Sequence, residues 1–240
     1  MLGWIQRLFR PQPRVEYFPD AIAMKKSGAA LGLRKAIEQR LSEDILILVV
    51  CHFPSTFFTT QDWLDEWGLR YEIQTTPLRP QQISSTGEFD ERPRLRLVLS
   101  EMLETETGLS SSDPSKTLSV MVTERHLLSI HDRRVETFCQ QVPHPVKLGY
   151  FLSLDAPAIA PLIGEMTEEI LKLWGMNDVD LITSELVTRR LDRARKWLDK
   201  EVQEEQVAES PRDWWILNGE PTRYAQASRS YLDRTESSND

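Results

Sequence analysis

The fold is decided by residues 45–51, which read ILILVVC. A continuous apolar run rich in β-branched residues is typical of a strand buried on both faces, as in a parallel sheet. A helix is expected next, because Ser55 can cap it, apolar residues recur at helical spacing and Gly68 is a C-terminal signal. Residues 70–76, RYEIQTT, are expected to form the following strand. Strand, helix and strand together form a βαβ unit, which predicts a parallel sheet with a right-handed crossover.

Further elements are expected on both sides of this unit, and together they predict an α/β protein. Residues 28–42 have the apolar spacing of a helix, and a helix closed by Gly175 is expected over residues 159–174. Three more strands are expected at residues 95–99, 118–122 and 148–154. A long helix at 185–206 carries one apolar stripe, formed by Val187, Leu191, Ala194, Leu198 and Val202.

Composition excludes several classes of protein. Of the 240 residues, 40% are hydrophobic and 28% are charged, which is ordinary for a globular protein with a sizeable core. The formal net charge of -8 argues against nucleic acid as a partner. Two cysteines, Cys51 and Cys139, are too few for a disulfide framework and favour a reducing, cytoplasmic location. No apolar run reaches about 18 residues, so no membrane-spanning segment is expected.

The first fourteen residues differ from the rest, because they carry three arginines and no acid. An amphipathic helix is expected here, ended by Pro11 and Pro13. Its apolar face is formed by Leu2, Ile5, Leu8 and Phe9, with Trp4 at the edge. One interpretation is an interfacial helix on anionic lipid, which would give weak peripheral contact at the inner face of the membrane. The other is a frayed N-terminus that docks on its own domain.

These features give four segments. Residues 1–14 form the amphipathic helix, 15–180 the α/β lobe, and 181–210 contain the long helix. Residues 211–240 are expected to be a tail that is partly disordered, since it turns polar and ends in RTESSND.

The motifs of several common active sites are missing. Neither the phosphate-binding pattern G-x-x-x-x-G-K-[ST] nor the nucleophile pattern G-x-S-x-G occurs. His126, His131, Cys139 and His144 could suggest zinc, but spacings of four, seven and four residues match no common finger. Ordinary surface or loop histidines are the favoured alternative, so we expect no metal and no cofactor. Cys51 and His52 could form a catalytic pair at the end of the buried strand, but adjacent strand residues point to opposite faces and cannot face each other. Cys51 is therefore expected to be a core residue.

Two clusters invite a binding interpretation. Five cationic side chains crowd the long helix: Arg189, Arg190, Arg193, Arg195 and Lys196. Glu185, Asp192 and Asp199 interleave with them, so a solvated, salt-bridged face is favoured over an anionic partner. Trp214 and Trp215 follow Pro211 and are candidates for a docking element.

Three segments carry a resemblance to a known family. Residues 122–126 (VTERH) follow a strand, residues 150–155 (YFLSLD) come next, and residues 184–194 (SELVTRRLDRA) open the long helix. In this order and spacing they resemble the second motor lobe of SecA, the preprotein translocase ATPase, with its G-T-E-R-H, F-Y-L-S-L-E-D and I-E-S-x-L-V-S-R-x-I-E-x-A-Q segments. The resemblance covers about residues 15–205. It implies a RecA-like parallel sheet flanked by helices, followed by a long C-terminal helix that begins a scaffold.

The departures concern the residues that hydrolyse ATP in that family. Where the family has R-G-R-x-G-R-Q-G-D, residues 135–145 read VETFCQQVPHP; where it has T-N-M-A-G-R-G-T-D-I, residues 98–104 read VLSEMLE. No stretch matches the first motor lobe with its Walker motifs, or the preprotein cross-linking domain. Loss of an arginine finger costs roughly three to five orders of magnitude in rate. We therefore expect a pseudo-ATPase that cannot hydrolyse a nucleotide by itself.

The resemblance and the departures together suggest an interaction protein. We expect it to dock on another protein, such as a translocase or helicase-like motor, through the sheet surface that would close on the missing lobe. One alternative is an accessory lobe of an ATPase assembled in trans, and another is an unrelated small-molecule enzyme on the same scaffold. The expected contact residues are Arg125, His126, Arg133, Arg134, Leu198, Val202, Trp214 and Trp215. Of these, Arg133 and Arg134 form the basic pair near the lost motif, and no catalytic residue is expected.

Overall fold

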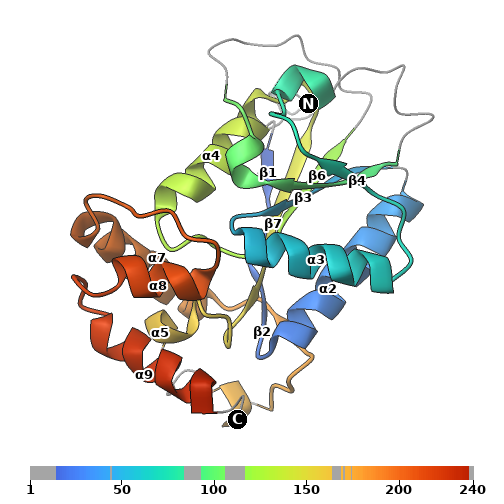
Figure 1. Ribbon diagram of the computed structural model, residues 1–240. Coiled ribbons are helices and arrows are strands. Elements are labelled where there is room, and N and C mark those ends of the chain that lie inside the picture. Colours follow the sequence, from blue (N-terminus) through green and yellow to red (C-terminus); the bar gives the residue numbers. More distant parts are fainter. Residues whose placement is uncertain are drawn as a thin grey trace, which may run out of the picture.

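The computed structural model describes residues 15–43, 45–83, 93–105, 117–163, 169, 171–173 and 175–237. Within them, eight strands form a sheet with the order β4-β5-β3-β6-β7-β2-β8, and β1 also pairs with β7 (Figure 1). The strands are β1 Val15–Tyr17, β2 Ala21–Ala23, β3 Leu46–Cys51, β4 Glu72–Gln74, β5 Leu95–Leu99, β6 Leu118–Val122, β7 Val146–Ser153 and β8 Leu181–Ile182. Neighbouring strands run parallel, except that β8 is antiparallel to β2.

The strand expected at residues 45–51 is confirmed as the central strand β3. Every residue of β3 is buried, and the strand pairs in parallel with β5 on one side and β6 on the other. The register places Val49 opposite Leu97 and Met121. A strand with neighbours on both sides and helices on both faces has no solvated face, which explains its uninterrupted apolar sequence. The expected α/β fold, with a mostly parallel sheet flanked by helices, is confirmed.

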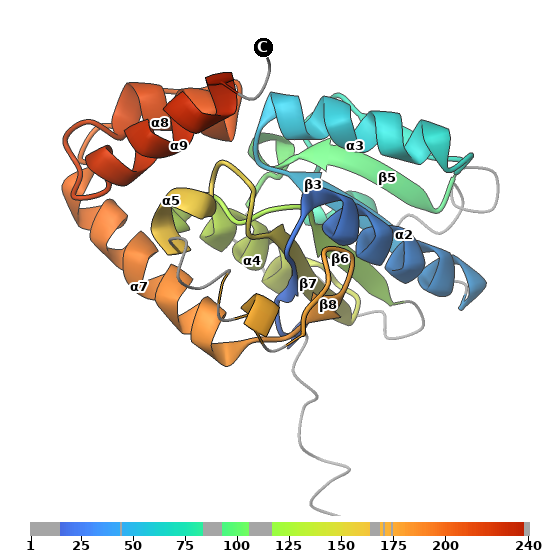
Figure 2. The same cartoon turned by 90° about the horizontal axis from the view of Figure 1, so that it is seen from below.

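Helices cover both faces of the sheet (Figures 1 and 2). They are α2 Lys26–Ser42, α3 Pro54–Glu66, α4 Ser129–Gln141, α5 Ala160–Ile163, α7 Glu185–Glu201, α8 Pro211–Asn218 and α9 Ala225–Ser237, with short 3₁₀ helices η1 Pro80–Ile83 and η2 Ser100–Met102. One core packs Leu33 of α2 and Phe57 of α3 on one face of the sheet. A second core packs Val135 of α4 and Leu191 of α7 on the other face. The C-terminal helices α7, α8 and α9 therefore belong to the lobe and do not leave it.

A break between β1 and β2 brings a carboxylate into the interior. The two strands pair with successive parts of β7, so that Val15 lies opposite Val146 and Ala21 lies opposite Phe151. Asp20 lies in the break and is buried. A buried carboxylate requires a partner, and Asp20 accepts a hydrogen bond from Arg125.

The long helix ends earlier than the sequence suggests. The helix expected at 185–206 is α7, which ends at Glu201. It is capped by Ser184, whose side chain accepts the N–H of Val187 at 3.4 Å. The backbone of Val202 leaves the helical region, and the chain then turns back towards α8, where the Gln206 N–H donates to Asn218 Oδ1 at 2.7 Å.

The C-terminal segment is the main correction to the expected domain plan. Residues 211–237 form α8 and α9 and not a partly disordered tail, while residues 238–240 lie outside the described part of the chain. The physical reason is burial of two large aromatic side chains, since Trp214 and Trp215 are almost fully enclosed. Trp215 Nε1 also donates to the carbonyl oxygen of Pro157 at 2.8 Å.

Three other expectations concern element ends and the N-terminus. Gly68 and Gly175 have φ angles of 66° and 83°, as expected for residues that end helices. Of the helix expected at 159–174, the described residues show α5 and helical residues 171–173. The expected N-terminal helix at 1–14 lies outside the described residues. Among the helices that are described, none combines the length and apolar character needed to cross a bilayer.

Candidate functional site

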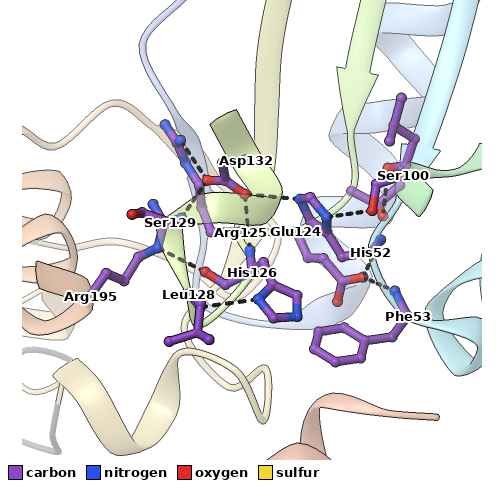
Figure 3. Close-up of polar contacts among 12 residues, drawn as sticks. His52, Phe53, Ser100, Glu124, Arg125, His126, Leu128, Ser129, Asp132 and Arg195 are labelled. Atoms are coloured by element: carbon purple, nitrogen blue, oxygen red, sulfur yellow. Dashed lines mark hydrogen bonds and ion pairs between the residues drawn. The ribbon is translucent and has the colours of Figure 1, made fainter. Parts of the chain in front are cut away.

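Polar side chains gather at the carboxyl edge of the central strands (Figure 3). His52 follows β3, Ser100 follows β5, and Glu124 to His126 follow β6. Parallel strands end at the same edge of a sheet, and open α/β sheets bind ligands at this edge. Helix α4 begins near this edge, and Asp132 in its first turn reaches the group.

Asp132 is the centre of the cluster and contacts one histidine and two arginines. Its Oδ1 lies 2.9 Å from His52 Nε2, and its Oδ2 lies 2.9 Å from Arg125 Nη1 and 2.8 Å from Arg195 Nη2. Burial by itself would raise the pKa of Asp132, but the His52 hydrogen bond and the charges of Arg195 and Arg125 hold it well below its ordinary value. Asp132 is therefore an anion at neutral pH.

Both arginines form ion pairs and hydrogen bonds with other groups of the protein. Arg125 also donates to Asp20 Oδ1 at 2.7 Å, and its guanidinium lies 3.4 Å from the ring centroid of Tyr150. Burial would lower the pKa of Arg125, but Asp132 and Asp20 raise it above its ordinary value. Arg195 donates from Nε to the His126 carbonyl oxygen at 2.8 Å. Two carboxylates and two guanidinium groups thus form one network joining the β1–β2 break, the end of β6, α4 and α7.

Ser100, His52 and Asp132 occur in the spatial order of a nucleophile, a base and an orienting carboxylate. His52 Nδ1 lies 2.9 Å from Ser100 Oγ, while its Nε2 faces Asp132. However, Ser100 is only 3% exposed and the His52 side chain is completely buried. Asp132 is moreover shared with two arginines, which stabilise it as an anion. We interpret the three residues as a buried polar connection between β3, β5 and α4.

Glu124 occupies the N-terminal end of α3. Its Oε1 accepts the backbone N–H groups of His52 at 3.1 Å and Phe53 at 3.3 Å, and its Oε2 accepts the Thr56 hydroxyl at 2.9 Å. Burial raises the pKa of Glu124, although His52 and these hydrogen bonds oppose the effect. The next free N–H in the turn, that of Ser55, donates to the carbonyl oxygen of Glu209 at 2.9 Å. The end of a helix that follows a central strand is a natural place for a phosphate, and here the protein fills it with its own oxygens.

A second group lies beside this network and could in principle hold a metal. His126, His131 and Glu205 bring their ligand atoms within 4.8 Å of one another. The hydrogen bonds argue against a metal, because His126 Nδ1 accepts the Leu128 N–H at 3.0 Å, which leaves the proton of the neutral ring on Nε2. Burial, with His52 and His131 nearby, keeps the pKa of His126 well below its ordinary value. Nε2 is then a donor and not a metal ligand.

Glu205 serves this second group as an acceptor. It accepts from His131 Nε2 and from Trp214 Nε1, each at 2.7 Å. Burial would raise the pKa of Glu205, but these two hydrogen bonds lower it. The carboxylate thereby ties the segment before α8 to α4. Cys139 and His144, the other members of the four-residue zinc pattern, are buried outside this group.

The structure separates the expected contact residues into three sets. Arg125 and His126 belong to the buried network, whereas Arg133 and Arg134 are exposed on α4. The third set consists of core residues, which corrects the expectation that they meet a partner: Leu198, Val202, Trp214 and Trp215. The apolar stripe of α7 packs against its own lobe along its whole length. The membrane-contact candidates Leu2, Trp4, Ile5, Leu8 and Phe9 lie outside the described residues.

Sequence reasoning missed most of the network. His52 and Glu124 were visible as polar residues at the ends of expected strands, and Ser100 follows another. The rule that parallel strands end at one edge would have brought these three together. Asp132 and Arg195 carry no such signal, because they come from helices whose packing decides their position.

Comparisons with known proteins give no family. No family model matches the chain, and no curated protein matches it. One similar solved structure is the C-terminal part of the Fun30 ATPase domain, with 12% identity and a TM-score of 0.39; the match covers 70% of this chain and 53% of that one. Another is the C-terminal domain of a possible DNA helicase from Lactobacillus plantarum WCFS1, with 12% identity and a TM-score of 0.31, covering 60% of this chain and 76% of that one. This chain thus spans about half the length of the first structure. With TM-scores below 0.5, neither likeness bears on function.

Proposed function

We propose that the chain is a non-hydrolysing, helicase-lobe-like accessory protein that acts by binding another protein. The observation that supports this most directly is Glu124 at the N-terminal end of α3. Its carboxylate takes the N–H groups of His52 and Phe53, at the place where phosphate-binding proteins of this architecture hold their ligand. A nucleotide phosphate at this position would meet a buried carboxylate.

The arginine network gives independent support. Hydrolysis of a nucleotide needs a guanidinium or ammonium that can reach the transferred phosphate. Arg125 and Arg195 are the two guanidinium groups of the network at the carboxyl edge, and both are held by Asp132. Moving either arginine to a phosphate would leave a buried carboxylate with too few partners, which costs several kcal/mol.

The direct test is a calorimetric titration of the whole chain with ATP and with ADP, each with magnesium. We expect no binding in the micromolar range and no release of phosphate over hours. Micromolar binding of either nucleotide would overturn the first half of the proposal.

The partner half is tested by affinity capture with the tagged chain followed by mass spectrometry. We expect a translocase or helicase-like motor protein among the captured proteins, with no requirement for nucleic acid. Capture that yields no motor or membrane-transport protein would count heavily against this role. A bait carrying Asp132→Asn, which weakens the fold, controls for capture by exposed apolar surface.

A second candidate is an accessory lobe that contacts a nucleotide held by another chain. It rests on Arg133, whose side chain is 69% exposed, and on the neighbouring Arg134. Arg133 contacts Ser129 Oγ at 2.6 Å and lies 3.8 Å from Asp199 Oδ2, so its guanidinium can turn outward at little cost.

This candidate predicts that the chain stimulates ATP turnover by the captured motor. Arg133→Ala with Arg134→Ala should abolish the stimulation, whereas Arg189→Ala, at an exposed arginine of α7, should not. An equal rate with and without the chain would remove the candidate.

A further inference from the structure

A cavity of about 390 Å³ lies between α2 and α3, at the carboxyl ends of β6 and β7. Small-molecule sites commonly have volumes of roughly 300–1,000 Å³. Residues 210–212 and Tyr231 of α9 line the cavity together with the two helices, and Figure 2 shows the C-terminal helices beside the start of α3. The cavity therefore lies where open parallel sheets bind ligands. Asp132 and Ser100 do not line it, so it is distinct from the centre of the ion-pair network.

The walls of this cavity are mainly apolar. Lys26, Ala29 and Leu33 face it from α2, at spacings of three and four residues along one side of the helix. Trp63 faces it from α3, and Phe151 from β7. Two aromatic rings and aliphatic side chains around a space of this size suit a flat apolar body.

One cationic side chain of the lining has no carboxylate partner in the described part of the chain. The Lys26 ammonium lies 5.5 Å from the ring centroid of Trp63, and among the described residues it forms no ion pair with a carboxylate. The two carboxylates of the lining contact other groups. Glu124 is engaged by three donors and burial raises its pKa, and Asp155 lies 3.9 Å from Lys25.

We propose that this cavity binds a small organic anion with a flat apolar body. Its anionic group pairs with Lys26 at the rim, and its body lies against Ala29, Leu33 and Trp63. Burial of the apolar body supplies most of the affinity, and the charge selects the ligand class. This site goes beyond the proposed accessory role, because binding of a small anion requires no partner protein and no nucleotide.

The test is calorimetry of the full chain with three probes of the same shape and different charge: 2-naphthoate, 2-naphthalenemethanol and 2-naphthylmethylamine. We expect saturable one-to-one binding of the naphthoate, about tenfold weaker binding of the neutral alcohol, and the weakest binding for the amine. Absence of saturable binding by all three probes, or tightest binding of the amine, would overturn the proposal.

Variants locate the binding. Lys26→Gln should weaken naphthoate binding about tenfold and leave alcohol binding unchanged. Lys35→Gln, the same substitution at an exposed position of the same helix, should change neither. Ala29→Phe should fill the cavity and remove binding of both probes. If Ala29→Phe does not fold, the Lys26→Gln and Lys35→Gln pair still decides, because equal affinities in these two variants contradict the assigned site.

Discussion

The carboxylate of Glu124 accepts the backbone N–H of Phe53 at 3.3 Å, so that a residue following β6 caps the helix that follows β3. Phe53 itself offers no side-chain cap, and Pro54 at the first helical position has no N–H to satisfy. A capping acceptor is normally supplied by the residue just before the helix. Here it comes from 71 positions further along the chain. One contact thus fixes the start of α3, joins two strands and removes an anion site.

This contact predicts a difference between two substitutions of Glu124. Glu124→Ala leaves the buried N–H groups of His52 and Phe53 without an acceptor, and we expect a loss of about 2–4 kcal/mol in the free energy of unfolding. Glu124→Gln keeps an acceptor oxygen, so its stability should stay within about 1 kcal/mol of the wild type. Urea denaturation followed by circular dichroism measures both values. Equal losses in the two variants would show that the cap is not the reason for the buried carboxylate.

The same residue predicts a dependence of stability on pH. The folded protein raises the pKa of Glu124 above the 4.5 of an exposed glutamate, because burial disfavours the charge. Above pH 4.5 the unfolded chain loses this proton first, so the folded state binds more protons and stability falls as pH rises. We therefore expect the wild type to lose stability relative to Glu124→Gln between about pH 4.5 and neutral pH. Denaturation of both proteins at several pH values checks the sign of this slope.

Asp132 should behave in the opposite way. Asp132→Asn removes the charge shared by His52, Arg125 and Arg195, and breaking such a buried network typically costs about 3–5 kcal/mol. Because the folded protein lowers the pKa of Asp132, its contribution is present above the unfolded pKa of 3.8 and is lost as pH falls below it. The difference between wild type and variant should therefore shrink in acid. Asp62→Asn, at an exposed position of α3, should cost less than about 0.5 kcal/mol at any pH.

The fold could be predicted where a segment's own sequence decides its structure. Residues 46–51 are apolar throughout because β3 is buried on both faces, and Gly68 marks the end of α3 because only glycine takes its φ of 66° without strain. Helix α4 was missed, because its polar residues hide a short buried stripe of Val135, Phe138 and Cys139. Strands β1 and β8 are too short to leave a period of two.

The site could be predicted only in part. The ends of β3, β5 and β6 point to His52, Ser100 and Glu124, since parallel strands share an edge. Asp20 and Arg125 are 105 positions apart and meet because the β1–β2 break and the end of β6 lie on either side of β7. No local pattern records such a pairing. The burial of Trp214 was also hidden, because its partner Glu205 lies in an irregular segment between two helices.

The last prediction concerns α7, where the sequence left a choice between core and docking surface. Leu198 is completely buried, whereas Leu186 on the same helix is 56% exposed. Removing a buried leucine side chain leaves a cavity as well as losing transfer free energy, so Leu198→Ala should cost about 2–5 kcal/mol. Leu186→Ala should cost less than about 0.5 kcal/mol.

The stronger Leu198→Asp, Val202→Asp double variant should lower the melting temperature greatly while the protein elutes as before in size exclusion, because no interface is lost. A double variant that keeps its melting temperature but changes its elution volume would show that this end of α7 serves an interface after all. A partner would then bind the apolar stripe of α7 and not the surface around Arg133 and Arg134 of α4.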